Sequence, residues 1–207
     1  MLWKYPRLLK LLLYMKLTVN EIFYSLQGEG GRVGEPSIFI RLTKCNLACS
    51  FCDTDFADGD DMSLDDILNV ISKFPCKWII WTGGEPTLQL KNDHLAFFKE
   101  RGYKQAIETN GTKPVPSLID YITCSPKVNY SRIKELIPRV NEIRIPLLNG
   151  DVLPDIDIFP VADKYFVSPV FDGDKPNTEN INYCVEQVKA DTRWTLSLQV
   201  HKLIHIE

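Results

Sequence analysis

The segment Cys45-Asn46-Leu47-Ala48-Cys49-Ser50-Phe51-Cys52-Asp53-Thr54 places three cysteines at the spacing C-x3-C-x2-C. Thiolates in such an arrangement bind iron–sulfur clusters or zinc. A closed zinc site needs four protein ligands, but no second cysteine pair follows and no histidine lies within 40 residues on either side. Three close thiolates suit a cubane cluster instead. Its fourth iron then has no protein ligand, so a molecule with an amine and a carboxylate can chelate it.

The composition indicates a globular protein with one domain. A chain of 207 residues is long enough for a real core. The net charge of -3 gives no reason to expect an electrostatic nucleic-acid binder. Apart from the cluster motif only Cys76, Cys124 and Cys184 remain, and three scattered cysteines do not make a disulfide scaffold. This cysteine usage predicts a reducing, cytoplasmic location.

Residues 1–14 differ from the rest of the chain. They carry three basic residues and no acidic one, around a short apolar run. That run is too short and too interrupted to cross a membrane, and no small-residue cleavage site of a signal peptide follows it. We therefore expect residues 1–14 to be an extension or an over-long start, and residues 15–207 to form a single domain without membrane association.

Apolar, β-rich segments alternate with helical patterns, which predicts a parallel α/β sheet with right-handed crossovers. Six principal strands are expected between Pro36 and Ser168. A closed eight-stranded barrel usually needs about 250 residues, so we expect an open, partial (β/α) barrel with trimmed helices. The expected strands cover 17–26, 36–42, 77–81, 104–109, 121–124, 142–147, 163–168 and 194–200. The expected helices cover 91–101, 131–136, 178–190 and a segment from Ser63 to about Lys73, where Ser63 and Asp66 resemble a capping box.

Four loops follow the carboxyl ends of expected strands, where the active sites of parallel α/β folds lie. They are the cysteine segment, Thr82-Gly83-Gly84-Glu85-Pro86, Thr109-Asn110-Gly111 and Ser125-Pro126-Lys127. The glycines of the second loop allow a close approach to a ligand, and its carbonyls can accept hydrogen bonds from an ammonium group. Arg41 lies near the end of the strand before the cysteines. Its planar fork suits a carboxylate, although a surface arginine is an equally good interpretation.

Two of these motifs together resemble those of the radical S-adenosylmethionine (SAM) superfamily. Phe51 fills the aromatic position of C-x3-C-x-aromatic-C, and the Gly-Gly-Glu-Pro type of motif follows about 30 residues later. Four further features resemble the 7-carboxy-7-deazaguanine synthase family within that superfamily. They are Ser25-Leu26-Gln27-Gly28-Glu29-Gly30, Arg41, Cys52-Asp53-Thr54 and Gln199-Val200-His201-Lys202. The likeness covers nearly the whole chain from Met15.

The resemblance implies a reaction, its cofactors and its partners. Members of that family contract the ring of 6-carboxy-5,6,7,8-tetrahydropterin with loss of ammonia, and the product leads to queuosine and related bases. The expected cofactors are a [4Fe–4S] cluster, SAM and Mg2+. A low-potential electron reduces the cluster, SAM is cleaved, and the 5′-deoxyadenosyl radical takes a hydrogen from the substrate. A flavodoxin or ferredoxin type of electron donor and a homodimer are expected, without nucleic acid or membrane.

The resemblance also assigns roles to residues. Cys45, Cys49 and Cys52 would ligate the cluster. The Thr54 hydroxyl, which from the residues alone indicates a loop cap, would bind Mg2+, an ion that prefers oxygen ligands. The C-terminal tail is either a frayed end or a segment that folds over the pterin, with the Glu207 carboxylate accepting hydrogen bonds from it. The expected SAM contacts are Phe51, Cys52, Asp53, Gly84, Glu85, Ser125, Pro126, Lys127, Ser168 and Asp172. The expected pterin contacts are Leu26, Gln27, Gly28, Glu29, Arg41, Thr82, His201 and Glu207.

Two other functions are compatible with part of this pattern. A glycyl-radical activating enzyme shares the cysteine spacing and the Gly-Gly-Glu-Pro type of motif but acts on a large protein, and Gln27, Glu29 and the segment 52–54 argue against it. A non-enzymatic iron–sulfur or zinc module would need a fourth protein ligand. The available candidates are the distant Cys76, Cys124, Cys184, His94, His201 and His205.

Overall fold

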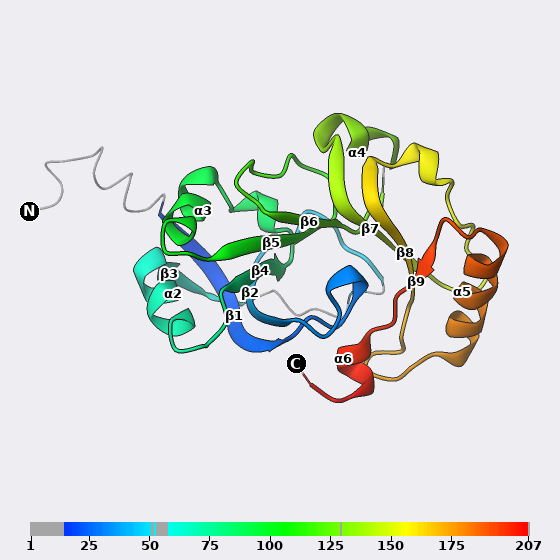
Figure 1. Ribbon diagram of the computed structural model, residues 1–207, viewed down its shortest axis with the longest axis horizontal. Coiled ribbons are helices and arrows are strands. Elements are labelled where there is room, and N and C mark those ends of the chain that lie inside the picture. Colours follow the sequence, from blue (N-terminus) through cyan, green and yellow to red (C-terminus); the bar gives the residue numbers. More distant parts are fainter. Residues whose placement is uncertain (1–14, 51, 53–57, 129, 207) are drawn as a thin grey trace, which may run out of the picture.

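The computed structural model of the protein describes residues 15–50, 52, 58–128 and 130–206 (Figure 1). The strands are β1 (Lys16–Leu26), β2 (Pro36–Leu42), β3 (Asp60–Ser63), β4 (Trp78–Gly83), β5 (Lys104–Thr109), β6 (Tyr121–Cys124), β7 (Arg139–Leu147), β8 (Val161–Pro169) and β9 (Thr195–Leu196). The α-helices are α2 (Leu64–Ile71), α3 (Asn92–Lys99), α4 (Tyr130–Leu136), α5 (Thr178–Ala190) and α6 (Val200–Leu203). Short 3-10 helices are η2 (Gly30–Arg32), η3 (Pro86–Leu88) and η4 (Ile156–Ile158).

The strands form a single sheet in the order β3-β1-β2-β4-β5-β6-β7-β8-β9. Strands β2 and β4 to β9 are all parallel to one another, whereas β1 is antiparallel to both β2 and β3. The six expected principal strands are confirmed as β2 and β4 to β8. Within the described residues the edge strands β3 and β9 do not pair, so the sheet is open, as the length of the chain predicts.

One edge of this sheet was not foreseen. Residues 60–63 form β3, which pairs with the beginning of β1. Acidic residues have a low strand propensity, and Asp60 and Asp61 are exposed in this short strand. The extended conformation is therefore imposed by pairing with β1. Short edge strands that carry charges are a common way to prevent edge-to-edge aggregation.

The prediction of a last strand over 194–200 is wrong except at Thr195 and Leu196. The N–H of Ser197 still donates to the Val167 carbonyl of β8, at 2.9 Å. The N–H of Val200 instead donates to the Gly28 carbonyl, also at 2.9 Å, and the chain coils into α6. A contact with a residue far away in sequence thus ends the strand, which no local pattern could indicate.

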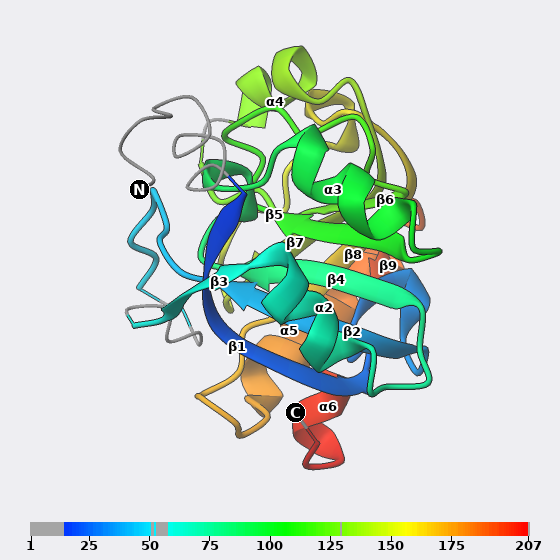
Figure 2. The same cartoon turned by 90° about the vertical axis from the view of Figure 1, so that its left-hand side faces the viewer.

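Helices cover the outer face of the sheet and leave its inner face largely polar. Helices α2 and α3 lie over β1, β4 and β5 (Figure 2) and enclose an apolar core that includes Trp81 and Phe98. Helices α4 and α5 enclose a second core with β6 to β8. On the inner face the buried apolar cluster is small and consists of Phe39, Ile80 and Ala106. Among the described residues, no helix is both long and apolar enough to cross a membrane.

Candidate active site

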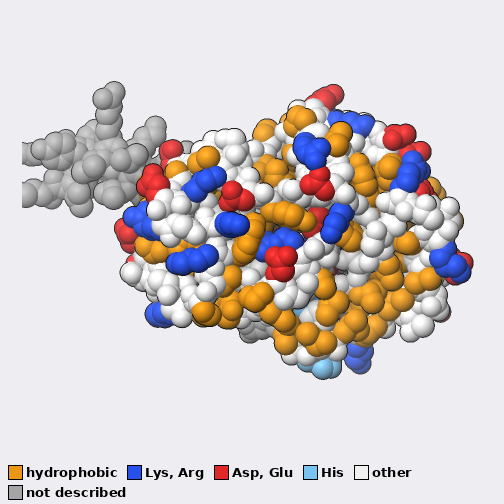
Figure 3. All heavy atoms as spheres, in the orientation of Figure 1, with side chains coloured by type: hydrophobic (Ala, Val, Ile, Leu, Met, Phe, Trp, Pro, Cys, Tyr) orange, Lys and Arg blue, Asp and Glu red, His pale blue; other side chains and the backbone are white. Residues whose placement is uncertain are grey.

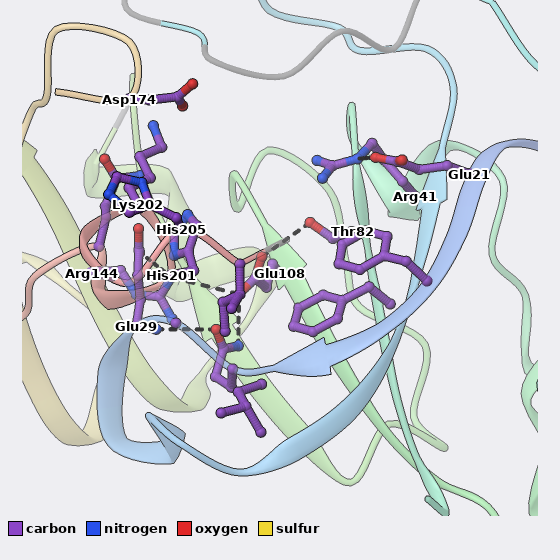
Figure 4. Close-up of a pocket in the computed structure, with 17 residues that line it drawn as sticks. Glu21, Glu29, Arg41, Thr82, Glu108, Arg144, Asp174, His201, Lys202 and His205 are labelled. Carbon is purple, nitrogen blue, oxygen red and sulfur yellow. Dashed lines mark hydrogen bonds and ion pairs between the residues drawn. The ribbon is translucent and has the colours of Figure 1, made fainter. Parts of the chain in front are cut away.

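Two adjoining cavities open at the carboxyl ends of the parallel strands. The smaller, of about 260 Å³, lies beside the cysteine segment and the ends of β4, β5, β6 and β8. The larger, of about 580 Å³, lies between β1, β2 and α6 (Figure 4). Six of the described residues line both cavities, namely Glu29, Thr82, Glu108, Arg144, Gln199 and Lys202. Molecules bound in the two cavities would therefore be neighbours.

The three cysteines of the sequence motif all line the smaller cavity. The N–H of Leu47 lies 3.4 Å from the Cys45 sulfur, and the N–H of Cys52 donates to the Cys49 carbonyl at 3.2 Å. The loop thus folds back on itself and brings the thiols to one wall. Burial raises the pKa of the Cys49 thiol, while the Lys127 ammonium group acts in the opposite direction.

This donor set fits an iron–sulfur cluster better than a single metal ion. In the described parts of the chain, no three His, Cys, Asp or Glu side chains are close enough to hold one ion. A cubane makes a different demand, because each thiolate binds a different iron and the sulfur atoms need not converge on one point. Three thiols along one cavity wall, with no fourth ligand nearby in the part of the chain that the structure describes, therefore suit a [4Fe–4S] cluster with one open iron.

The glycine pair at the end of β4 lets that strand pack tightly against the cysteine segment. Gly83 has φ +115°, a conformation that residues with a side chain rarely adopt. A Cβ at Gly83 would lie 2.1 Å from the Leu42 carbonyl oxygen, and one at Gly84 would lie 2.0 Å from the Lys44 carbonyl oxygen. Both glycines line the smaller cavity. The motif therefore holds the chain close to the cluster loop while exposing its backbone to a ligand.

Glu85, an expected SAM contact, is fully buried beneath these loops. Its carboxylate accepts hydrogen bonds from the hydroxyls of Thr87 and Thr109, at 2.5 and 2.8 Å, and from the N–H of Asn110, at 2.7 Å. Glu85 is not one of the described residues that line either cavity. The structure places it as a brace that joins the loop after β4 to the loop after β5.

The larger cavity gathers seven of the eight residues that the sequence assigns to the pterin. They come from β1 with its following loop, from the ends of β2 and β4, and from α6, as Figure 4 shows for Glu29, Arg41, Thr82 and His201. They are Leu26, Gln27, Gly28, Glu29, Arg41, Thr82 and His201. The eighth, Glu207, lies outside the described residues.

A buried arginine, which the sequence analysis missed, connects the two cavities. The Arg144 guanidinium lies 2.6 Å from Glu29 and 3.5 Å from both Glu108 and Glu142. Burial alone lowers the pKa of Arg144, but the three carboxylates outweigh burial and hold that pKa above its ordinary value. Glu142 also accepts a hydrogen bond from the Tyr121 hydroxyl at 2.5 Å, and burial together with this bond raises the tyrosine pKa. One charged network thus supports the wall between the cavities.

Glu108 is the second residue that the sequence analysis missed. Its two carboxylate oxygens accept hydrogen bonds from the Gln27 amide at 3.1 Å and the Thr82 hydroxyl at 3.0 Å. Glu108 and Arg144 share a feature that could have revealed them. Each is a charged residue near the carboxyl end of a largely buried parallel strand, and a charge in that position is costly unless it is paired or functional.

The C-terminal segment closes one side of the larger cavity. Helix α6 is tied to the loop after β1 by the backbone bond between Val200 and Gly28. A Cβ at Gly28 would lie 2.1 Å from the His201 imidazole Nδ1, so the glycine is needed for this contact. Lys202 and His205 line the cavity beside His201.

The remaining expected SAM contacts are placed unevenly. Ser125, Lys127 and Ser168 line the smaller cavity, and the buried Ser168 hydroxyl has no hydrogen-bond partner among the described residues. Of the described residues, Pro126 and Asp172 line neither cavity. Asp172 is exposed and accepts a hydrogen bond from the Asn177 amide at 2.9 Å. Outside the described residues lie Phe51, Asp53 and Thr54.

Comparisons with known proteins agree with this geometry. Residues 39–123 match the model of the Radical SAM superfamily. The 7-carboxy-7-deazaguanine synthase of Bacteroides thetaiotaomicron is 41% identical over 93% of this chain and 100% of its own length. That of Haemophilus influenzae is 43% identical over 91% of this chain and 93% of its own length. The crystal structure of QueE from Escherichia coli superposes with a TM-score of 0.71 and 26% identity, covering 93% of this chain and 98% of that one.

Proposed function

Because this chain belongs to the 7-carboxy-7-deazaguanine synthase family of radical SAM enzymes, we propose that one of its two cavities holds the substrate and the other holds the cofactors. The enzyme is a lyase that uses a [4Fe–4S] cluster and SAM to make 7-carboxy-7-deazaguanine for queuosine biosynthesis. The larger cavity holds 6-carboxy-5,6,7,8-tetrahydropterin, and the smaller holds the cluster with SAM. The shared wall of Glu29, Thr82, Glu108 and Arg144 supports this assignment, because it makes the two ligands neighbours.

The charges around the larger cavity match the two ends of a carboxylated pterin. The pyrimidine edge of a pterin presents N–H donors, for which the Glu29 and Glu108 carboxylates supply acceptors beside the balancing charge of Arg144. The opposite end carries the carboxylate, for which the Arg41 fork is suited. Arg41 lies on the other side of the cavity from the two glutamates (Figure 4). This polarity orients the ring in one direction.

The smaller cavity supplies groups for SAM. The Lys127 ammonium group provides a positive charge for the amino-acid carboxylate. The buried Ser168 hydroxyl supplies a hydrogen-bonding group that the protein itself does not satisfy. Cys45, Cys49 and Cys52 hold the cluster on the facing wall. When bound, the cluster and SAM supply the radical that starts the reaction, and this chain's own residues position the substrate beside it.

Three finer proposals rest on the family resemblance. The Thr54 hydroxyl binds Mg2+ together with the pterin carboxylate, in keeping with the preference of that ion for oxygen ligands. A flavodoxin or ferredoxin type of protein donates the electron in the cytoplasm. The enzyme is a homodimer, and exposed apolar side chains around α6 offer a surface for a second copy (Figure 3). These side chains are Leu26, Leu203, Ile204 and Ile206.

An anaerobic assay tests the function directly. The reconstituted protein is incubated with dithionite, SAM, Mg2+ and 6-carboxytetrahydropterin, and the products are followed by mass spectrometry. We expect 7-carboxy-7-deazaguanine to appear. Formation of 5′-deoxyadenosine while the pterin is unchanged would contradict the substrate assignment and favour a protein substrate, as in a glycyl-radical activating enzyme. A protein without SAM cleavage despite a full cluster would contradict the enzymatic function altogether.

A further inference from the structure

A charged pair joins β1 and β2 at the edge of the larger cavity. The Arg41 Nε lies 2.5 Å from a carboxylate oxygen of Glu21. The two residues are directly opposite in the antiparallel register of the strands. Both line the cavity, and Figure 4 shows the guanidinium pointing into it, with Glu21 on the side away from its centre. Nothing in the sequence motifs draws attention to Glu21.

A β-bulge brings Glu21 to this face of the sheet. Val19 pairs with Leu42 and Glu21 pairs with Arg41, so β1 has one residue more than β2 between these two pairs. Such an insertion reverses the alternation of side chains that follow it. Val19 packs into the outer core, as does Ile22, whereas Glu21 lines the inner cavity. Without the bulge, Glu21 would point to the same outer face as Val19.

Arg41 is held on two sides by this arrangement. Glu21 accepts the hydrogen bond from Nε, and the Phe23 ring lies under the guanidinium, with 5.6 Å between Cζ and the ring centroid. Phe23 in turn stacks on Phe39, with ring centroids 4.8 Å apart and planes inclined by 5°. A guanidinium fixed at Nε and on one face has a defined orientation for its terminal amino groups, which are the groups that make a two-point contact with a carboxylate.

We propose that Glu21 is a positioning residue that anchors Arg41 for capture of the substrate carboxylate. This inference rests on the proposed function, in which Arg41 binds the carboxylate of the pterin. Glu21 acts through Arg41 and does not itself touch the substrate. The cross-strand register holds both backbones at the required separation, so the pair can persist when the cavity is filled.

An opposite role for the same pair makes a different prediction. If Glu21 occupied the place of the substrate carboxylate in the empty enzyme, the substrate would have to displace it, and neutralising Glu21 would strengthen binding. If Glu21 anchors Arg41, neutralising it weakens binding. The geometry favours the anchor, because Glu21 engages Nε from the side away from the centre of the cavity, while the guanidinium points toward that centre (Figure 4).

The test compares two stable probes, 6-carboxypterin and pterin, which differ only in the carboxylate. Dissociation constants are measured anaerobically by calorimetry on the enzyme loaded with cluster, SAM and Mg2+. We compare the wild type with Glu21→Gln, Arg41→Gln and the control Asp163→Asn. Asp163 also pairs with an arginine of a neighbouring strand, Arg139, but far from the cavities. A half-exposed ion pair contributes little to stability, so all variants should fold, and their melting temperatures verify it.

We expect the wild type to bind 6-carboxypterin more tightly than pterin, and Arg41→Gln to lose this preference. Glu21→Gln should weaken the binding of 6-carboxypterin about tenfold, because charge-assisted hydrogen bonds are the strong ones. Its affinity for pterin should not change. In turnover, Glu21→Gln should raise KM for the carboxytetrahydropterin without raising KM for SAM, and Glu21→Asp should restore part of the affinity. Unchanged or tighter 6-carboxypterin binding by Glu21→Gln, while Arg41→Gln loses the preference, would overturn the anchor and leave the proposed function intact. A wild type without preference, or an Arg41→Gln variant that keeps it, would overturn the carboxylate assignment itself.

Discussion

Arg144 lines both cavities and also contacts a carboxylate that is buried in the sheet. Its guanidinium contacts three carboxylates, of which Glu142 is fully enclosed and Glu29 and Glu108 face the cavities. Removing one partner from a buried charge pair is strongly destabilising, because the other charge is left without compensation. Arg144 itself is therefore a poor position for testing function. Glu108 is better, since its side chain is 26% exposed and reaches the ligand space.

The variant Glu108→Gln should lose affinity for the pterin. The amide keeps the size of the side chain but replaces a carboxylate acceptor that, in our proposal, faces the N–H edge of the ring. We expect KM for the carboxytetrahydropterin to rise about tenfold, which corresponds to about 1.4 kcal/mol, and KM for SAM to change much less. Steady-state kinetics check this, with Glu186→Gln on the exposed surface of α5 as control. Equal increases in both KM values would contradict the assignment of Glu108 to the pterin.

Gly28→Ala should separate the C-terminal helix from the cavity. The new methyl group would lie 2.1 Å from the His201 ring, so α6 must move and the histidine leaves its place. We expect a raised KM for the pterin and faster limited proteolysis of the C-terminal segment. Asn69→Ala on the exposed surface of α2 is the control, because it lies far from both cavities. A proteolysis rate equal to that of wild type would show that α6 is not held by this contact.

Among the structural elements, α2 illustrates how a local signal can define a boundary. Its capping box is formed as predicted: the Asp66 N–H donates to the Ser63 hydroxyl oxygen at 3.1 Å, and the Ser63 N–H donates to the Asp66 carboxylate at 3.1 Å. The helix then presents Leu64, Ile67 and Ile71 to the outer core. The cap fixes the first turn, and the apolar face fixes the packing of the helix against the sheet.

Ser63→Ala should lower the free energy of unfolding by about 1 kcal/mol, the usual cost of losing such a cap. Hydrogen bonds from Ser63 lower the pKa of Asp66 below its ordinary value of 3.8. The pKa of Asp66 is lower in the folded than in the unfolded protein, so ionised Asp66 stabilises the fold. This contribution to the free energy of unfolding is present above pH 3.8 and is lost as the pH falls through the folded pKa. Urea unfolding at several pH values from 6 to 3 measures both effects. Asp66→Asn should remove this pH-dependent part, and an unchanged profile would contradict the assignment.

The elements differ in how far their sequences could predict them. Strands β2, β5 and β6 and helix α5 have the predicted bounds, because each is a local apolar pattern between clear turn or cap signals. The acidic β3 and the short β9 do not follow from their sequences. Pairing with β1 makes β3 extended. After β9, the hydrogen bond from Val200 to Gly28 stops the strand, and the chain continues as helix α6.

At the scale of the whole molecule, the two cavities lie between parts of the open sheet that are far apart in the sequence. The smaller cavity is lined by the cysteine loop, by the ends of β4 to β8 and by the segment before α6. A ligand seated there would lie between elements that are far apart in the sequence, from the cysteine loop to the segment before α6. Binding should therefore stabilise the whole fold, because a ligand that binds only the folded state shifts the unfolding equilibrium.

SAM at one hundred times its Kd should raise the free energy of unfolding of the cluster-loaded protein by about 2.7 kcal/mol. For a domain of this size, that corresponds to an increase in Tm of roughly 5 to 10 °C. Anaerobic thermal unfolding measures the increase. Lys127→Met should reduce it at the same SAM concentration, since the proposed partner of the SAM carboxylate is gone, whereas Lys113→Met on the exposed surface should not. An equal shift in Lys127→Met would contradict the role of Lys127.

The spacing of three cysteines, the glycine-rich motif at the end of β4 and the alternation of strands with helices are local patterns, so the fold class and the superfamily could be read from the sequence. The seven predicted residues that line the larger cavity are implied by the family resemblance. The partners of Arg144 could not be read from the sequence, because Glu29 and Glu108 lie 115 and 36 positions away and meet it through strand order. Likewise, Glu21 reaches Arg41 because a one-residue bulge reverses the face of β1. Periodicity within a strand reports which side chains share a face, but the tertiary structure sets which faces and which strand ends come together.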